Sequence, residues 1–244
     1  MTKQLLIYEN TIPLSVERHK KWCLQNTSNF SFAKDVNAFP LLGTEFSPAA
    51  LIYPIVFVKT ESILYPSIIT GIKDHENFFV TKSGEWQADY IPAFVRRYPF
   101  IFSISEDQKT FTVCIDESFD GWNQNGSGER LFDSEENQTQ YLKNVVAFLR
   151  DYQASFLATE AFSRKLMELN LLEGMQASLT INNVVQKPFQ GFLGINRDKL
   201  KSLTPEVLYE FMQLGWLELI YLHLHSLNHF SRLTSMMSDR LNDG

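Results

Sequence analysis

Two adjacent arginines, Arg96 and Arg97, lie in the stretch of the chain that is densest in residues able to recognise a ligand. The stretch covers residues 84–102 and reads GEWQADYIPAFVRRYPFIF. A guanidinium presents a planar fork of donors that suits a carboxylate or a phosphate. Neighbouring side chains point in different directions in a helix or a strand. Two interpretations stay open: an internal ion pair with a carboxylate such as Asp89 or Asp116, or a site for a ligand or partner anion.

The first functional hypothesis is a binding surface for a peptide or protein partner. Aromatic residues and arginine are enriched at interfaces and contribute much of the binding energy there. The two prolines of the stretch favour extended geometry before them and are expected to hold the neighbouring side chains rigidly. The residues expected to form this surface are Trp86, Tyr90, Arg96, Arg97 and Tyr98.

The alternative hypothesis is an enzyme of unrecognised type that acts on a peptide or a small acidic substrate. Its weak catalytic candidates are His19, Glu45 and Asp89, with Arg96 beside them, and their convergence depends entirely on the fold. The chain contains no GxSxG, GxxxxGK[ST] or GxGxxG motif. The absence of these motifs favours a protein that binds without catalysing.

No metal or cofactor is expected. His225 and His229 are four residues apart and would share one face of a helix, as metal ligands can. There is no HExxH motif, and the apolar residues around them favour a place in the core. Cys23 and Cys114 lie far apart in the sequence and have no zinc spacing, so reduced thiols in a cytoplasmic protein are expected.

Composition excludes several classes of protein. The 244 residues carry a net charge of −6 and no clustered run of Lys or Arg, so no nucleic-acid partner is expected. The N-terminus lacks the pattern of a signal peptide, and no window has the roughly 18 uninterrupted apolar residues of a membrane span. A hydrophobic content of 44% is typical of a soluble globular protein.

The first half of the chain is expected to be rich in short antiparallel strands. Branched and aromatic residues alternate with turn residues such as Ser83-Gly84 and 106–109. A helical turn is predicted to begin at Pro92. Trp122, within a polar loop, either packs back onto the sheet or lies at a binding surface. The predicted strands are 55–58, 67–72, 77–80, 100–105 and 110–116.

The second half is expected to be rich in helices. Helical spacing predicts one long helix or two over residues 136–172, and a final, largely buried helix from Pro205 to about Met237. Two strands, at 176–181 and 189–195, are predicted between them, joined by a turn that contains Lys187. Glu218 is expected to be buried and to pair with one of the two arginines.

These elements predict an α+β fold in which a mostly antiparallel sheet from the first half packs against helices of the second half. A single domain is expected over residues 1–244, strand-rich over 1–130 and helix-rich over 131–244, because no linker composition separates the halves.

The chain resembles the SapC family of bacterial proteins over nearly its full length. The family takes its name from a protein associated with surface-layer gene clusters. The matching segments are RHKKW at 18–22, FPLLGTEFSPAALIYPIVF at 39–57, ENFFV at 76–80, GEWQADYIPAFVRRYPF at 84–100, CIDE at 114–117, LF at 131–132, TEAF at 159–162, LNLLEGMQA at 169–177 and GWLELIYLHLHSL at 215–227.

The resemblance indicates which proteins accompany family members more than it indicates a reaction. Family members often occur beside tryptophan-halogenase-like proteins, cupin-like hydroxylase relatives and TonB-dependent receptors. No catalytic residue is transferred to this chain by the resemblance. The expected function is therefore that of a non-catalytic accessory protein that binds a peptide or protein, with the enzyme above or a structural subunit of an envelope-related assembly as alternatives. The oligomeric state is left open by the sequence.

Overall fold

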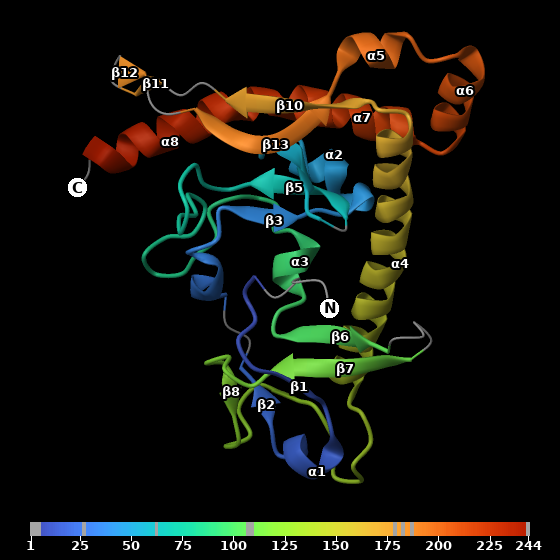
Figure 1. Ribbon diagram of the computed structural model, residues 1–244. Helices are drawn as coiled ribbons and strands as arrows, with labels where there is room; N and C mark the ends of the chain where they lie inside the picture. Colours follow the sequence, from blue (N-terminus) through green and yellow to red (C-terminus); the bar gives the residue numbers. More distant parts are fainter. Residues whose placement is uncertain are drawn as a thin grey trace.

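The structure is a computed structural model that describes residues 6–25, 28–61, 63–105, 110–177, 180–181, 184–185 and 188–242. Figure 1 labels its helices and strands. In the first half these are β1 (Thr11–Pro13), α1 (Val16–His19), β2 (Cys23–Leu24), η1 (Ser31–Ala33), β3 (Ala38–Pro40), η2 (Gly43–Glu45), α2 (Phe46–Ala49), β4 (Ile55–Lys59), β5 (Leu64–Ile69), α3 (Ala93–Arg96), β6 (Phe100–Ile104), β7 (Phe111–Asp116), β8 (Trp122–Asn123) and β9 (Glu129–Arg130). In the second half they are α4 (Gln140–Glu168), β10 (Leu172–Ala177), β11 (Thr180–Ile181), β12 (Val184–Val185), β13 (Phe189–Ile195), α5 (Arg197–Lys201), α6 (Pro205–Gln213), α7 (Trp216–Ser226), η3 (Leu227–His229) and α8 (Phe230–Asn242).

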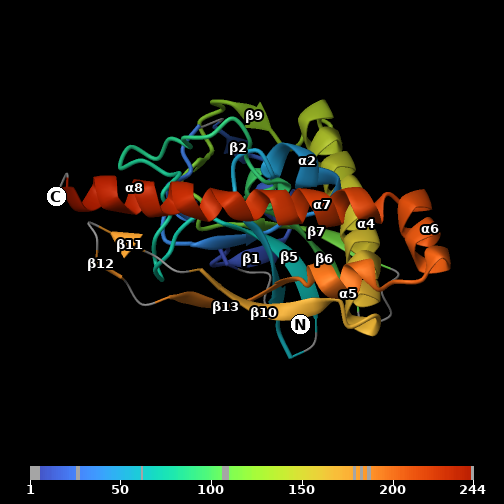
Figure 2. The same cartoon turned by 90° about the horizontal axis from the view of Figure 1, so that it is seen from above.

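The larger sheet is antiparallel and has the strand order β10-β13-β4-β5-β3. Ile55, Val56 and Phe57 are consecutive in β4, and all three are fully buried. Consecutive burial means that both faces of this strand are covered. α7 contacts β4 and β13, while α4 contacts β5. Seen from above, α7 and α8 lie end to end across this part of the molecule (Figure 2).

A second, smaller set of strands lies at the other end of the molecule, at the bottom of Figure 1. One antiparallel sheet has the order β1-β7-β6, and short strands form a further sheet in the order β8-β2-β9. Their side chains enclose a separate hydrophobic cluster around Phe100, Ile115 and Leu131. The molecule therefore has two clusters of buried side chains, one under each group of strands.

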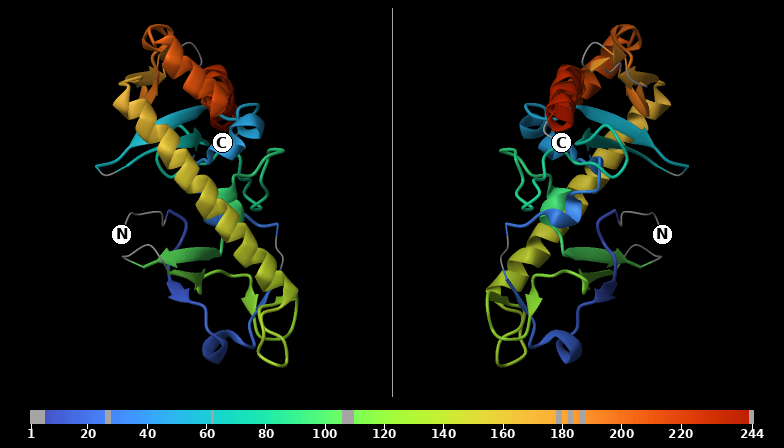
Figure 3. Two further views of the ribbon diagram at one scale, coloured as in Figure 1. Left: turned by 90° about the vertical axis from the view of Figure 1, so that its right-hand side faces the viewer. Right: turned by 90° about the vertical axis from the view of Figure 1, so that its left-hand side faces the viewer.

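Helix α4 connects the two clusters (Figure 3). Thr139 caps it by accepting a hydrogen bond from the backbone N–H of Leu142, and it continues without a break for 29 residues. Leu142 and Leu149 pack in the smaller cluster, whereas Phe162 and Leu166 pack in the larger one. The single-helix interpretation of residues 136–172 is therefore the one observed. Because one rigid element enters both clusters, the expectation of a single domain over 1–244 is retained as a proposal.

The C-terminal helical region differs from the expected single helix in one place. Gly215 has a φ of 70°, in the left-handed region that glycine tolerates, and it turns the chain between α6 and α7. From Trp216 to Asn242 the chain is then continuously helical. Glu218 is exposed on α7, so the expected buried ion pair with an arginine is wrong. The face of α7 that packs against β4 and β13 carries Ile220 and His223 instead.

The predicted strand at residues 77–80 is also wrong. Asn77 accepts a hydrogen bond from the N–H of Phe79 (2.9 Å) and donates one to the carbonyl of Ala33 (3.0 Å). Such a local side-chain bond competes with strand pairing. Only Val80 keeps an isolated bridge, to Trp86.

The α+β fold class is confirmed, with antiparallel sheets in the first half and helices in the second. The short helix after Pro92 is confirmed as α3. Two predicted turns, 106–109 and the one at Lys187, lie outside the described residues.

Candidate functional site

An open cleft of about 470 Å³ lies between segments that are far apart in the sequence. Four segments form its walls. They are the residues before β1, the region around η1, Tyr98 after α3, and the loop between β7 and β8. The lining residues are Leu6, Ile7, Tyr8, Glu9, Asn29, Ser31, Phe32, Tyr98, Ser118, Phe119, Asp120 and Gly121. Its volume lies within the roughly 300–1,000 Å³ that ligand pockets have.

Four aromatic rings form one wall of the cleft, with Tyr98 at their centre. Phe32 stacks on Tyr98 with 4.2 Å between ring centroids. Tyr8 and Phe119 each meet Tyr98 edge-on, at 5.2 Å. These offset and edge-to-face arrangements are the favourable ones for aromatic pairs. The rings therefore make a wall whose members fix one another.

The charged side chains that line the cleft are both acidic. Glu9 and Asp120 are exposed at it, and no Lys, Arg or His is among its described lining residues. Asp116 is fully buried behind the wall, with Oδ2 3.5 Å from the hydroxyl of Tyr98. Burial, and then the negative charge of Asp116, raise the pKa of Tyr98 well above its ordinary value. The Tyr98 hydroxyl therefore stays neutral at physiological pH.

Asp116 joins two walls of the cleft through backbone donors. Its carboxylate accepts hydrogen bonds from the N–H groups of Glu9 (2.7 Å), Asn10 (3.1 Å) and Ser118 (3.0 Å). Glu9 precedes β1 and Ser118 follows β7, so the carboxylate at the end of β7 holds both segments against each other. Bonds to an ionised acceptor are roughly twice as strong as neutral ones. Asp116 is therefore a positioning residue for this cleft.

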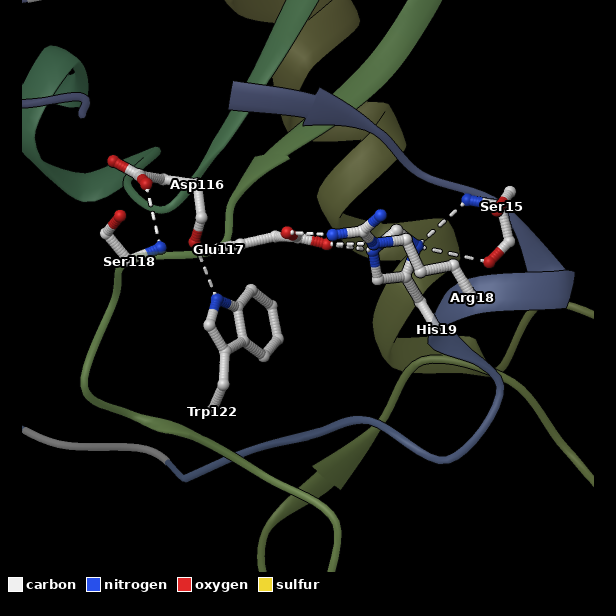
Figure 4. A network of polar contacts seen from close by, with 7 residues as sticks. All are labelled: Ser15, Arg18, His19, Asp116, Glu117, Ser118 and Trp122. Carbon is white, nitrogen blue, oxygen red and sulfur yellow. Dashed lines mark hydrogen bonds and ion pairs between the residues drawn. The ribbon is translucent and has the colours of Figure 1, made fainter. Parts of the chain in front are cut away.

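The next residue, Glu117, points away from the cleft and holds α1 (Figure 4). Its two carboxylate oxygens accept from Nε and Nη2 of Arg18, both at 2.5 Å, and Oε1 also lies 3.0 Å from Nε2 of His19. The bonds from Arg18 are the main reason that the pKa of Glu117 lies below its usual range. Nδ1 of His19 lies 3.1 Å from the backbone N of Ser15 and 3.2 Å from its carbonyl oxygen. His19 is fully buried, so its ring is occupied in fixing α1.

Trp122 packs back onto the sheet, which was one of the two alternatives for this residue. Its indole N–H donates to the carbonyl oxygen of Asp116 at 2.7 Å (Figure 4). Its ring meets those of Trp22 (5.5 Å), Phe100 (5.7 Å) and Phe119 (6.2 Å). Through Phe119, Trp122 supports the loop that forms one wall of the cleft.

Trp122→Phe is expected to lower the free energy of unfolding by about 1–2 kcal/mol, because the carbonyl of Asp116 loses its donor while most of the ring packing remains. Urea unfolding of the purified protein measures this loss. Trp22→Phe, which changes ring size on the partner of the same stack, is the reference. Equal losses in the two variants would mean that ring area, and not the hydrogen bond, determines the stability.

Of the five predicted binding residues, only Tyr98 lines the cleft. Arg96 is exposed, with its guanidinium 5.9 Å from the ring of Tyr90 and 5.4 Å from that of Phe148. Its Nε donates to the carbonyl oxygen of Ile91 at 2.9 Å. Arg96 therefore lies over aromatic rings on the surface, apart from the cleft lining.

Arg97 is buried among rings. Its guanidinium lies 4.3 Å from the ring centroid of Phe94, 4.5 Å from that of Tyr152 and 5.6 Å from that of Tyr8. Its Nε and Nη2 have no hydrogen-bond partner in the part of the chain that the structure describes. Among the described residues, neither arginine forms an ion pair with a carboxylate. The internal ion pair with Asp89 or Asp116 is therefore not observed, and the faces of the rings take its place.

Trp86 and Tyr90 belong to a chain of hydrogen bonds that ends on Glu45. The indole N–H of Trp86 donates to the hydroxyl of Tyr53 (2.9 Å), which donates to the carbonyl of Tyr90 (2.5 Å). The hydroxyl of Tyr90 in turn donates to Oε1 of Glu45 (2.5 Å). Both aromatic residues are half-buried. Their polar groups are thus engaged inside the fold.

The three weak catalytic candidates do not form one site. α1, which carries His19, lies at the bottom of Figure 1, and α2, which follows Glu45, lies near the top. Glu45 is buried with its oxygens bonded to Leu42, Tyr90 and Ala93. Asp89 is exposed.

The histidines considered as metal ligands have separate surroundings. His225 is exposed on α7, while Nε2 of His229 lies 2.9 Å from the carbonyl oxygen of Ala50. Within the described part of the chain, no three His, Cys, Asp or Glu side chains gather as metal ligands would. Cys23 and Cys114 are both buried free thiols.

Sequence reasoning missed most of the cleft, namely Tyr8, Glu9, Phe32, Phe119 and Asp120. These residues come from separate segments, so no spacing in the chain relates them. The one available signal was the aromatic residue inside the acidic loop 116–121, next to the strand that ends at Asp116.

A family model for SapC matches residues 14–233 of the chain. No curated protein and no solved structure matches it. Over the described residues, none of the helices has both the length and the apolar character that crossing a membrane requires.

Proposed function

This chain belongs to the SapC family, and on that premise we propose that it is a non-catalytic accessory protein whose cleft binds a segment of a protein partner. The observation that carries the proposal is the open cleft itself, with its wall of four aromatic rings. Aromatic anchors beside polar rim groups are the usual composition of a protein-binding hot spot.

The shape and lining of the cleft favour a peptide segment as the ligand. Rings supply apolar area, while the exposed side chains of Asn29, Ser118 and Asp120 supply polar groups at the rim. Specific binding sites combine these two features, because the apolar surface gives affinity and a few polar groups give orientation. The walls are held by Asp116, so little ordering entropy is lost when a ligand binds.

The state of the ionisable groups supports binding without catalysis. His19 and Glu117 bond to each other, the Glu45 carboxylate accepts three hydrogen bonds, and the Asp116 carboxylate accepts four. A general acid or base needs a reactive atom within hydrogen-bond reach of the substrate. The hydrogen bonds of these groups are made to other parts of the protein instead.

Ser118→Arg tests the proposal by filling the cleft. The side chain of Ser118 is exposed and lines the cleft, while the contact with Asp116 uses its backbone N–H, which the substitution keeps. We expect tagged Ser118→Arg protein to retain at least tenfold less partner than the natural protein in a pull-down from its own cells, quantified by mass spectrometry. Ser103→Arg, which places the same side chain on exposed β6 away from the cleft, is expected to retain the partner.

Equal retention by the Ser118→Arg and Ser103→Arg proteins, both shown to be folded by circular dichroism, would exclude the cleft as the binding site. Loss of the partner in both variants would point to a general effect of added positive charge, and would likewise contradict the proposal.

A further inference from the structure

We propose, resting on the function above, that the cleft selects a peptide segment carrying a lysine or arginine side chain. The charges and the rings that line the cleft both favour this class of ligand.

The charges that line the cleft are complementary to a cationic side chain. Glu9 and Asp120 are exposed carboxylates on opposite segments of the lining, and neither has a hydrogen bond or ion pair from its side chain among the described residues. The described lining contains no cationic side chain that would neutralise them. A cation that enters this cleft therefore meets two carboxylates that no described residue neutralises, whereas an anion meets charge of its own sign.

Two buried groups of opposite charge, Asp116 and Arg97, lie behind the wall. Asp116 lies next to the Tyr98 hydroxyl, and the guanidinium of Arg97 lies 5.6 Å from the ring of Tyr8. Arg97 is closer to Phe94 and Tyr152, at 4.3 and 4.5 Å, on the side of the core. Arg97 therefore lies on the core side, while the charged side chains in the described lining itself are the carboxylates of Glu9 and Asp120.

The aromatic wall of the cleft also favours a cationic side chain. A guanidinium or ammonium over the face of an aromatic ring gains about 0.5–2 kcal/mol, because the ring face carries partial negative charge. The rings of Tyr98 and Phe119, with Phe32 stacked beside them, lie in the same lining as the two carboxylates. The aliphatic stem of lysine or arginine packs on such rings while its charged head reaches a carboxylate. Neither a neutral polar nor an acidic side chain gains from both features.

The test uses purified full-length protein and fluorescently labelled, capped heptapeptide mixtures. The central residue of each mixture is fixed as Lys, Arg, Gln or Glu, and the flanking positions are randomised. We expect anisotropy to show at least tenfold tighter binding of the Lys or Arg mixture than of the Gln mixture, with the Glu mixture weakest. Raising the salt from 50 to 500 mM is expected to reduce this preference.

A matched pair of double variants assigns the preference to the cleft. Glu9→Gln with Asp120→Asn removes the two cleft carboxylates and is expected to lower the Lys-over-Gln preference to less than threefold. Glu17→Gln with Asp74→Asn removes two exposed carboxylates elsewhere and is expected to keep the preference. The two proteins have the same net charge, so the comparison separates the cleft from general electrostatics.

The outcomes distinguish this inference from the function on which it rests. Suppose that all mixtures bind equally, or that the Gln or Glu mixture binds best, and that Ser118→Arg abolishes this binding. The cleft would then remain a binding site, but the proposed ligand class would be wrong. A Lys or Arg preference unchanged in the Glu9/Asp120 variant would also overturn it. Binding unaffected by Ser118→Arg, or the absence of any binding, would overturn both. Light scattering that shows a dimer abolished by Ser118→Arg would make a second copy the occupant and contradict the inference.

Discussion

Replacement of Glu45 by alanine is expected to lower the free energy of unfolding by about 4 kcal/mol. The carboxylate is 4% exposed and accepts hydrogen bonds from the N–H of Leu42 (3.0 Å), the N–H of Ala93 (2.6 Å) and the hydroxyl of Tyr90 (2.5 Å). In the alanine variant these three donors lose their acceptor, the two backbone N–H groups in a buried place and the Tyr90 hydroxyl in a half-buried one. Each unsatisfied buried donor costs about 1–3 kcal/mol, and relaxation recovers part of the sum.

More conservative substitutions are expected to give a graded series. Glu45→Gln retains one oxygen, which can serve Tyr90 and Ala93, but turns an amide donor toward the N–H of Leu42, so a loss of about 2 kcal/mol is expected. Tyr90→Phe removes one donor and is expected to cost about 1 kcal/mol. Burial, followed by the bond to Glu45, raises the pKa of Tyr90, so this hydroxyl is a neutral donor across the physiological range.

Urea unfolding followed by tryptophan fluorescence measures the series, with midpoints compared at constant slope. Asp89→Ala is the control, because this carboxylate is exposed four residues before Ala93 and is expected to change stability by less than about 0.5 kcal/mol. A loss below about 1 kcal/mol in Glu45→Ala would mean that water satisfies these donors and that Glu45 does not hold α3 against η2.

Acidification from pH 7 to pH 5 is expected to remove about 2 kcal/mol of stability through His223 alone, rising to about 3 kcal/mol at pH 4. His223 is fully buried on α7, where Nε2 accepts the N–H of Ile195 in β13 (3.1 Å) and Nδ1 donates to the carbonyl of Ile55 in β4 (2.7 Å). Burial lowers the pKa of His223 from 6.5 to about 4, and the nearby positive charge of Arg197 contributes in the same direction.

The sign follows from proton binding in the two states. Between pH 6.5 and 4 the unfolded chain takes up a proton at His223 that the folded protein does not, so stability falls as the pH falls. Above about pH 6.5 the contribution is complete. Burial is the main reason that the neutral form is preferred, and protonation of the folded ring would also place a donor against the N–H of Ile195.

The prediction is measured as a difference between variants, because other histidines and carboxylates also titrate in this range. His223→Gln is expected to be less stable at pH 7 and to lose less stability between pH 7 and 5 than the natural protein. His225→Gln lies on the same helix with an exposed side chain and is expected to keep the natural pH dependence. If both variants show the same slope of unfolding free energy against pH, His223 is not the group responsible.

Local sequence rules were sufficient where neighbours along the chain determine the structure. Apolar spacing over residues 136–172 predicted the helical region that contains α4, because helical periodicity acts within a few residues, whereas the cap at Thr139 and the unbroken course of the helix were seen only in the structure. The helical turn predicted to begin at Pro92 is found one residue later, as α3, with Pro92 as its N-cap. The α+β class follows from the same signals, and the family follows from the motifs of the chain.

Only the tertiary structure decided which side chains meet. Nothing in the adjacency of Arg96 and Arg97 distinguishes them, yet one is exposed and the other is buried against Phe94 and Tyr152. Glu218, within an apolar run, is exposed because α7 packs against β4 and β13 through the face that carries Ile220 and His223.

The cleft is the clearest example of a feature that only the tertiary structure determines. Glu9 and Ser118 are brought together by the carboxylate of Asp116, through contacts that span up to 107 positions of the chain. The sequence by itself determined the fold class and the family, because those depend on local propensity and on motifs. The site depends on long-range packing, which no pattern of neighbouring residues encodes.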